Sequence, residues 1–152
     1  MKIQFIAKTI SSTFGSGFFP FAPGTVGAGI AIAILWLLPP MSVIYLSIFS
    51  LLFYFLGVWA STISEKSWGH DPGKINWDEV VGMMVTVIAV PKSLVGYFIA
   101  FVLFRIFDVL KPFPINESQD LPKGWGVMTD DILAGIYSNI ILQFIFRVLW
   151  IQ

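Results

Sequence analysis

The chain has 152 residues, of which 57% are hydrophobic and 12% are charged, and its formal net charge is zero. Soluble domains carry about twice that charged fraction, so the composition indicates a membrane protein, and the absence of net positive charge argues against a nucleic-acid partner. The sequence contains no cysteine, which excludes disulfides, a thiolate nucleophile and cysteine-bound metals. No internal repeat is visible, and we expect residues 1–152 to form a single domain.

The first element is a short amphipathic segment. Ile3, Ile6, Ile10 and Phe14 recur at helical spacing, which favours a helix lying on the membrane surface; a frayed N-terminal tail is an equally good interpretation. The Gly- and Pro-rich stretch that follows is typical of a loop, with Thr25 as the expected N-cap of the next helix.

Five apolar segments follow, and we expect them to be helices embedded in the membrane. They cover residues 26–38, 42–61, 80–90, 94–109 and 132–150, and several are shorter than the roughly 20 residues that cross a bilayer. The predicted fold is therefore all-α: a polytopic membrane helical bundle of about four to five embedded segments, preceded by the short interfacial helix.

The turns between these segments predict where the charged residues meet. Pro39-Pro40 and Pro91-Lys92-Ser93 end the first and third segments, because proline cannot continue a helix. If both are tight turns at one face of the membrane, every other connection lies at the opposite face. That face then holds the conspicuous acids and most of the lysine and arginine residues, which identifies it as the cytoplasmic face.

Two acidic doublets, Asp78-Glu79 and Asp130-Asp131, stand where helices are expected to begin. Acids in a first turn also cap helices and complement the helix dipole, which explains any single one of them about equally well. Two doublets facing one pocket favour a functional role, because a cap needs only one side chain. Consecutive helical residues diverge by about 100°, so we expect one member of each pair to bind an ion and its neighbour to orient a group or a water.

Asp108 lies at the C-terminal end of its segment, where the helix dipole disfavours an anion. Arg105 and Lys111, three residues away on either side, can pair with it on one helical face. A local ion pair is the simpler interpretation. We favour a metal ligand beside a phosphate-binding cation, because ionisable groups within membrane segments are functional by default.

Several carboxylates without sulfur suit Mg²⁺. The expected metal ligands are Asp78, Asp108, Asp130 and Asp131. Glu79 or Asp131 could act as base toward the attacking water, and His70-Asp71 as a general acid or base, although a single interfacial histidine is nearly as often a solvated loop residue. The groups expected to hold phosphate oxygens are Lys111, Arg105, Asn76 and Thr25.

The motifs that carry these residues resemble phosphatidylglycerophosphatase A, a bacterial family. The matching stretches run in order through nearly the whole chain: Phe14-Gly-Ser-Gly, Pro23-Gly-Thr-Val-Gly27, Gly69-His-Asp, Trp77-Asp-Glu-Val-Val-Gly-Met83, Phe104-Arg-Ile-Phe-Asp-Val-Leu-Lys-Pro-Phe-Pro-Ile115 and Gly124-Trp-Gly-Val-Met-Thr-Asp-Asp-Ile-Leu-Ala-Gly135. The resemblance implies an integral membrane, Mg²⁺-dependent enzyme that converts phosphatidylglycerophosphate to phosphatidylglycerol in phospholipid biosynthesis. One departure concerns the histidine: the family pattern leads us to expect His-Asp-His, and this chain has His70-Asp71-Pro72.

The resulting hypothesis is hydrolysis of the terminal phosphomonoester of a phospholipid by a multi-pass protein of the bacterial cytoplasmic membrane, with the active site facing the cytoplasm. One or two Mg²⁺ ions, water or an aspartate as nucleophile, an oligomer, the acceptance of other lipid phosphates and a lid formed by residues 14–25 all stay open. Two alternatives use the same acids differently. A small proton- or cation-coupled transporter predicts acids spread through the membrane depth, and a structural membrane subunit predicts a role in stability only.

Overall fold

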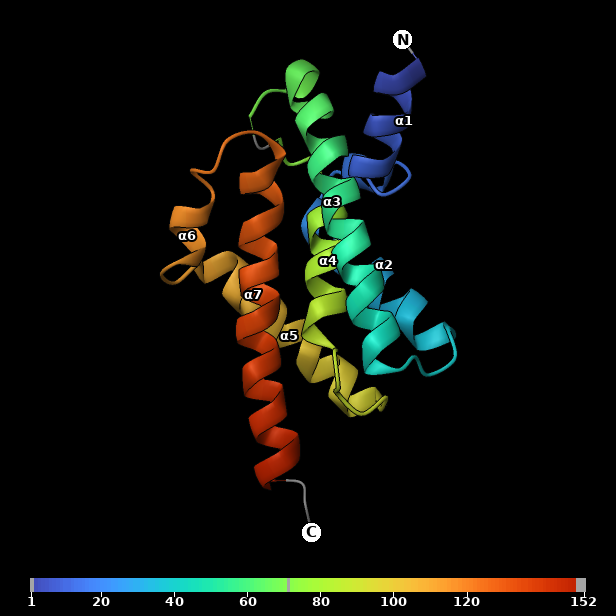
Figure 1. Ribbon diagram of the computed structural model, residues 1–152, viewed down its shortest axis with the longest axis vertical. Helices are drawn as coiled ribbons and strands as arrows, with labels where there is room; N and C mark the ends of the chain where they lie inside the picture. The colour runs from blue at the N-terminus through green and yellow to red at the C-terminus, as the bar shows by residue number, and fades with distance from the viewer. Residues whose placement is uncertain (1, 71, 150–152) are drawn as a thin grey trace.

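The computed structural model describes residues 2–70 and 72–149, and within these ranges all regular structure is helical (Figure 1). The all-α prediction is therefore confirmed. The helices are α1 (Lys2–Ser11), the 3₁₀ turn η1 (Ser16–Phe18), α2 (Pro23–Leu37), α3 (Val43–Trp68), α4 (Trp77–Thr86), α5 (Leu94–Leu110), α6 (Ile115–Ser118), α7 (Gly124–Phe144) and the π-helical turn η2 (Ile145–Leu149).

Local sequence signals set several of these boundaries. Ser42 Oγ accepts a hydrogen bond from the backbone N–H of Tyr45 at 3.3 Å, and Ser93 Oγ accepts one from Gly96 at 3.0 Å. Both serines are N-caps, which satisfy backbone donors at the starts of α3 and α5. α2 ends at Leu37, Leu38 is its C-cap, and Pro39 and Pro40 come next, as expected of residues that cannot continue a helix.

Other boundaries differ from the sequence predictions. Thr25 is not an N-cap: α2 begins at Pro23, and Ala22 occupies the cap position with φ 46°. The doublet Asp130-Asp131 does not stand at a helix start, because α7 begins at Gly124. The third segment ends at Thr86 rather than at residue 90, and α6 was not predicted.

The early start of α7 has a tertiary cause. A Cβ on Gly124 would lie 2.5 Å from the Val58 carbonyl oxygen of α3, and one on Gly126 would lie 2.4 Å from the carbonyl oxygen of Gln119. These close contacts fix a helix in a Gly-rich, polar stretch where helix propensity is low. The apolar run of residues 132–150, on which the prediction rested, therefore placed the helix start too late.

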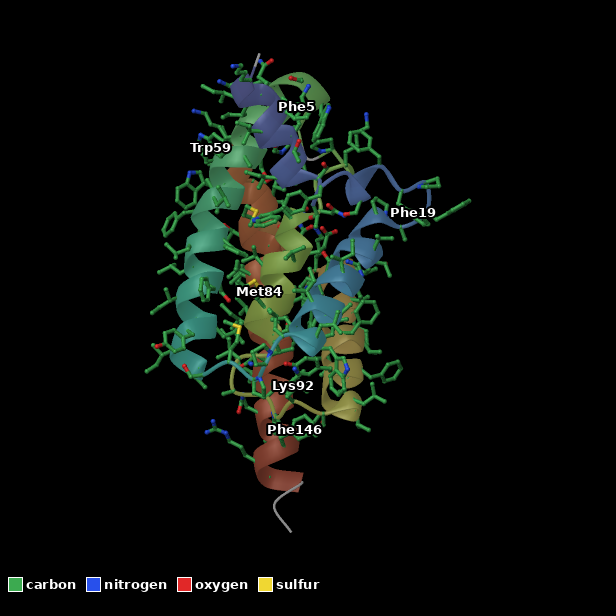
Figure 2. All side chains as sticks on the ribbon, turned by 90° about the vertical axis from the view of Figure 1, so that its right-hand side faces the viewer. Phe5, Phe19, Trp59, Met84, Lys92 and Phe146 are labelled. Atoms are coloured by element: carbon green, nitrogen blue, oxygen red, sulfur yellow. The ribbon has the colours of Figure 1, made fainter. Side chains whose placement is uncertain are left out.

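The centre of the bundle is α4. Eight of its ten residues are buried, and it contacts α2, α3, α5 and α7. Met84 of this helix lies in the middle of the molecule (Figure 2), and Met83 and Phe104 beside it are fully buried. A helix that is buried on nearly all sides can hold polar groups only where other elements supply partners for them.

The two proline-containing turns lie together at one end of the molecule. Lys92 Nζ donates a hydrogen bond to the Leu38 carbonyl oxygen, and Pro39 and Pro40 line a small cavity with Lys92. Phe5 of α1 marks the opposite end (Figure 2). This arrangement agrees with the expectation that both turns share one face.

Two helical stretches are long and apolar enough to cross a membrane, Val43–Trp68 and Gly124–Val148. Large apolar side chains of α3, including Ile44, Leu51 and Phe55, are exposed on the outside of the bundle. The helices α2, α4 and α5 have 15, 10 and 17 residues, fewer than the roughly 20 that cross a bilayer. The structure thus shows a helical bundle with two candidate membrane helices.

Candidate active site

The site forms where α4 and α7 cross, and two glycines allow the crossing. A Cβ on Gly82 would lie 2.8 Å from the backbone oxygen of Asp131, and one on Gly135 would lie 2.5 Å from the backbone oxygen of Gly82. Further along, Asn139 Nδ2 donates to the carbonyl oxygen of Thr86 at 2.9 Å. Residues later in α4 contact residues later in α7, so the two helices run in the same direction (Figure 1).

The crossing brings three carboxylates together. Oxygen atoms of Asp78, Glu79 and Asp131 lie within 4.8 Å of one another, and Asp78 and Asp131 are only 8% and 3% exposed. Glu79 Oε2 and Asp131 Oδ2 are buried and have no hydrogen-bond partner among the described residues. Unpaired buried carboxylate oxygens are costly, so either protonation or a bound cation would compensate this carboxylate cluster (Asp78, Glu79 and Asp131).

The electrostatics of Glu79 reflect its burial and the neighbouring carboxylates. Burial, and after it the charge of Asp131, raises the pKa of Glu79 from an ordinary 4.5 to about 8. Arg105 Nη1, 4.0 Å from Glu79 Oε1, offsets only part of this. A set of oxygen donors without nitrogen or sulfur fits Mg²⁺ or another hard divalent cation. Asp78, Glu79 and Asp131 are thus the residues that could hold a metal ion.

Asp130, next to Asp131, has different partners. Lys111 Nζ and Gln119 Nε2 donate to Asp130 Oδ2 at 2.6 and 2.8 Å. Burial disfavours the Lys111 ammonium, but the charge and hydrogen bond of Asp130 outweigh it and raise the pKa of Lys111. Lys111 therefore stays charged beside the cluster, held by Asp130. Sequence reasoning missed Gln119, because nothing in its polar surroundings marks it out.

Asp108 lies beside the cluster and forms an ion pair with Arg105, three residues earlier on α5. Its charge also acts on Asp131 and on Lys111. The local ion pair that the sequence offered as the simpler interpretation is present. A role of Asp108 as a metal ligand stays a prediction.

Asn76 connects the loop after α1 to the start of α4. It is fully buried, and its Nδ2 donates to Ser16 Oγ at 2.9 Å and to the Pro23 carbonyl oxygen at 3.1 Å. Because this amide group binds protein atoms, Asn76 holds the loop in place in this structure, and a direct phosphate contact stays a prediction.

The first turn of α2 lies against the site through Gly24. A Cβ there would lie 2.0 Å from Glu79 Oε1 and 3.2 Å from Arg105 Nη1. Thr25 is the next residue of this turn. The close approach of α2 thus places Thr25 at the edge of the site.

The structure does not bring His70 to the cluster. Its side chain is 67% exposed, and its Nδ1 lies 2.9 Å from Glu65 Oε1. Asp71, its predicted partner, lies outside the described residues. The described groups that do come together are carboxylates and the cations Lys111 and Arg105, an arrangement suited to a phosphate and a divalent ion.

Comparison with known proteins identifies the family. The family model described as phosphatidylglycerophosphatase A matches residues 9–146. The chain belongs to the phosphatidylglycerophosphatase A family. Family membership confirms both the resemblance found in the sequence and the expected activity class, a phosphatase.

Curated relatives match most of the chain. The phosphatidylglycerophosphatase A of Haemophilus influenzae is 42% identical over 134 residues, which cover 85% of this chain and 82% of the relative. That of Escherichia coli K12 is 40% identical over 135 residues, covering 87% and 78%. A Bacteroides thetaiotaomicron protein, provisionally named a phosphatidylinositol-3-phosphatase, is 42% identical over 147 residues, covering 91% and 92%. No solved structure matches the chain.

Proposed function

We propose that this chain hydrolyses the terminal phosphomonoester of phosphatidylglycerophosphate, giving phosphatidylglycerol and inorganic phosphate in phospholipid biosynthesis, and that it depends on Mg²⁺. The observation that carries the proposal is the buried carboxylate cluster, in which Glu79 Oε2 and Asp131 Oδ2 lack hydrogen-bond partners. Membership of the phosphatidylglycerophosphatase A family supplies the substrate class.

Each group beside the cluster has a role in this proposal. Asp78, Glu79 and Asp131 would hold the divalent cation, which when bound polarises the phosphoryl oxygens. Arg105 and Lys111 neutralise the negative charge that builds on the phosphoryl group. Asp108 and Asp130 hold these two cations in position.

The reaction itself exchanges one bond at phosphorus. The oxygen of a water molecule forms a bond to the phosphorus, and the bond from phosphorus to the glycerol oxygen breaks. The water proton goes to Glu79 Oε2 or Asp131 Oδ2, the two unpartnered oxygens. The leaving glycerol oxygen takes a proton from solvent water, and the carboxylic acid returns its proton to the solvent. An aspartate nucleophile is the competing route, and labelled phosphate that stays on the acid-quenched enzyme and is released by hydroxylamine would reveal it.

We place the protein in the bacterial cytoplasmic membrane as a multi-pass protein whose site faces the cytoplasm. Two candidate membrane helices support the membrane location. In the predicted crossing order, Lys92 and Arg147 lie at the membrane face opposite to the site. The other lysine and arginine residues lie at the face that holds the site. Cytoplasmic connections carry the excess of positive residues.

The transporter alternative fits these positions less well. An ion path needs acids at successive depths, whereas Asp78, Glu79 and Asp131 share one cluster and Asp108 acts on it electrostatically. The family is also one of phosphatases.

The direct test is phosphate release from phosphatidylglycerophosphate by the purified protein in detergent. We expect activity that EDTA abolishes and Mg²⁺ restores, and that falls at least 100-fold in Asp78→Asn, since loss of a metal-polarised step costs several kcal/mol. Glu117→Gln is the matched control, because Glu117 is an exposed acid of α6. Full activity in EDTA together with full activity of Asp78→Asn would rule the proposal out.

The same assay should include a phospholipid substrate with a different head group. The Bacteroides relative with the longest matched stretch is provisionally named a phosphatidylinositol-3-phosphatase. Both lipids carry a phosphomonoester on a polyol head group, and the cluster would act on that group in the same way. A higher kcat/KM for phosphatidylinositol 3-phosphate than for phosphatidylglycerophosphate would reassign the substrate while leaving the site unchanged.

A further inference from the structure

An apolar groove of about 400 Å³ runs between α2 and α5, which lie side by side (Figure 2). Gly29, Ala33 and Trp36 line it from α2, and Leu94, Phe98 and Phe101 line it from α5. Leu94 and Phe98 are 72% and 68% exposed, so the groove opens on the outside of the bundle. Its volume falls within the range of about 300–1,000 Å³ that is usual for ligand pockets.

The groove leads to the phosphate-binding side chains. Thr25 lies four residues before Gly29 on α2, and Arg105 lies four residues after Phe101 on α5. Each is therefore one helical turn beyond the groove-lining residues of its own helix, on the same face. The two extensions meet, because a Cβ on Gly24 would lie 3.2 Å from Arg105 Nη1. The apolar lining of the groove therefore ends next to Arg105, a cation beside the carboxylate cluster.

The length of this surface matches one leaflet of a bilayer. Thr25 to Trp36 and Leu94 to Arg105 each span roughly 16 Å at 1.5 Å per residue. The hydrocarbon core of a membrane is about 30 Å thick. A phosphate at Arg105 and a hydrocarbon chain in the groove would thus have the dimensions of a phospholipid in one leaflet.

A larger cavity of about 780 Å³ between α2, α3 and α4 is less suited to the same ligand. On α4 it is lined by Trp77, Val80 and Met84. At 100° per residue these side chains project from the face of α4 opposite to Asp78 and Glu79. A chain in that cavity would be separated from the cluster by α4 itself.

We propose that the groove between α2 and α5 binds one acyl chain of the phospholipid substrate, so that the enzyme selects membrane lipids with long chains over lipids whose chains are too short to fill it. This inference rests on the proposed function. The second acyl chain would stay in the surrounding bilayer.

Two neighbouring residues of α2 provide a matched test. Ala33 lines this groove, and Ile34 lines the larger cavity; both side chains are exposed, so each accepts a tryptophan without disturbing the core. Gly29→Leu is an independent variant, because a Cβ at Gly29 meets nothing within 4 Å. We would measure kcat and KM with dioleoyl and dihexanoyl phosphatidylglycerophosphate in detergent micelles.

We expect Ala33→Trp and Gly29→Leu to raise the KM for the dioleoyl lipid roughly tenfold or more, since two buried methylene groups account for about that factor in affinity. Ile34→Trp should leave this KM within about twofold, and Ala33→Trp should turn over the dihexanoyl lipid like the wild type, which also shows that it is folded.

Other outcomes would separate the two proposals. Equal effects of Ala33→Trp and Ile34→Trp, or an effect of Ile34→Trp alone, would overturn the groove assignment and leave the phosphatase activity standing. A wild-type protein inactive on both lipids would overturn the proposed function and this inference with it.

Discussion

At the scale of single residues, neighbouring acids have different environments. Asp131 belongs to the carboxylate cluster and keeps an unpaired oxygen, whereas Asp130 binds Lys111 and Gln119. The reason is geometric, because consecutive helical side chains diverge by about 100°. Asp78 and Glu79 behave otherwise, since oxygen atoms of both reach the same cluster.

This difference leads to a prediction for the second doublet. We expect Asp131→Asn to raise the Mg²⁺ concentration needed for half-maximal activity at least tenfold, since Asp131 would bind the ion. Asp130→Asn should lower kcat roughly 10- to 100-fold, because losing the hydrogen-bond partner of a functional group usually has an effect of that size. It should change the Mg²⁺ requirement little. Titration of activity with Mg²⁺ in both variants checks this. An equally raised Mg²⁺ requirement in Asp130→Asn would restore Asp130 as a ligand.

At the scale of helices, the site depends on how closely α4 and α7 approach. Gly82 and Gly135 each follow a cluster acid by one turn, Asp78 and Asp131 respectively, and they pack against each other's helix. Any larger side chain there would push the helices apart. Glycine therefore sets the distance between carboxylates that come from different helices.

Gly135→Ala tests this dependence. Its Cβ would lie 2.5 Å from the backbone oxygen of Gly82, so the helices must shift, at a cost of about 1–3 kcal/mol. We expect a lower thermal midpoint in detergent and at least a tenfold loss of kcat. Gly29→Ala is the control for the thermal midpoint only, because its Cβ meets no atom within 4 Å; it should leave that midpoint unchanged or slightly higher. Wild-type activity in Gly135→Ala would contradict the argument.

At the scale of the whole molecule, short helices are held within a bundle that contains two long ones. Where α4 ends, the carbonyl oxygens of Thr86 and Ile88 accept hydrogen bonds from Asn139 and Gln143 of α7. Such pairing is needed because an apolar environment offers no water to free backbone groups. The carboxylate cluster lies near the start of α4, and the proline-containing turns lie beyond its end.

Cysteine labelling tests the orientation of this bundle. The chain has no cysteine of its own, so Glu117→Cys and Pro40→Cys each introduce a single exposed thiol. We expect a membrane-impermeant maleimide to label Pro40→Cys in intact spheroplasts and Glu117→Cys only after permeabilisation, because the site's end should face the cytoplasm. Labelling of both from the same side would refute the predicted crossing order.

The sequence by itself determined that the chain is helical, where most of its helices lie, which motifs place it among the phosphatidylglycerophosphatases A, and that acids stand at the ends of apolar segments. These properties follow from local signals: apolar runs, the prolines that end them and the motifs between them. Only the tertiary structure decided that Asp78, Glu79 and Asp131 share one cluster, that Asp130 holds Lys111 with Gln119, and that α7 begins at Gly124. Distances between side chains of different helices depend on the register and closeness of the crossing, and spacing along one chain does not contain them.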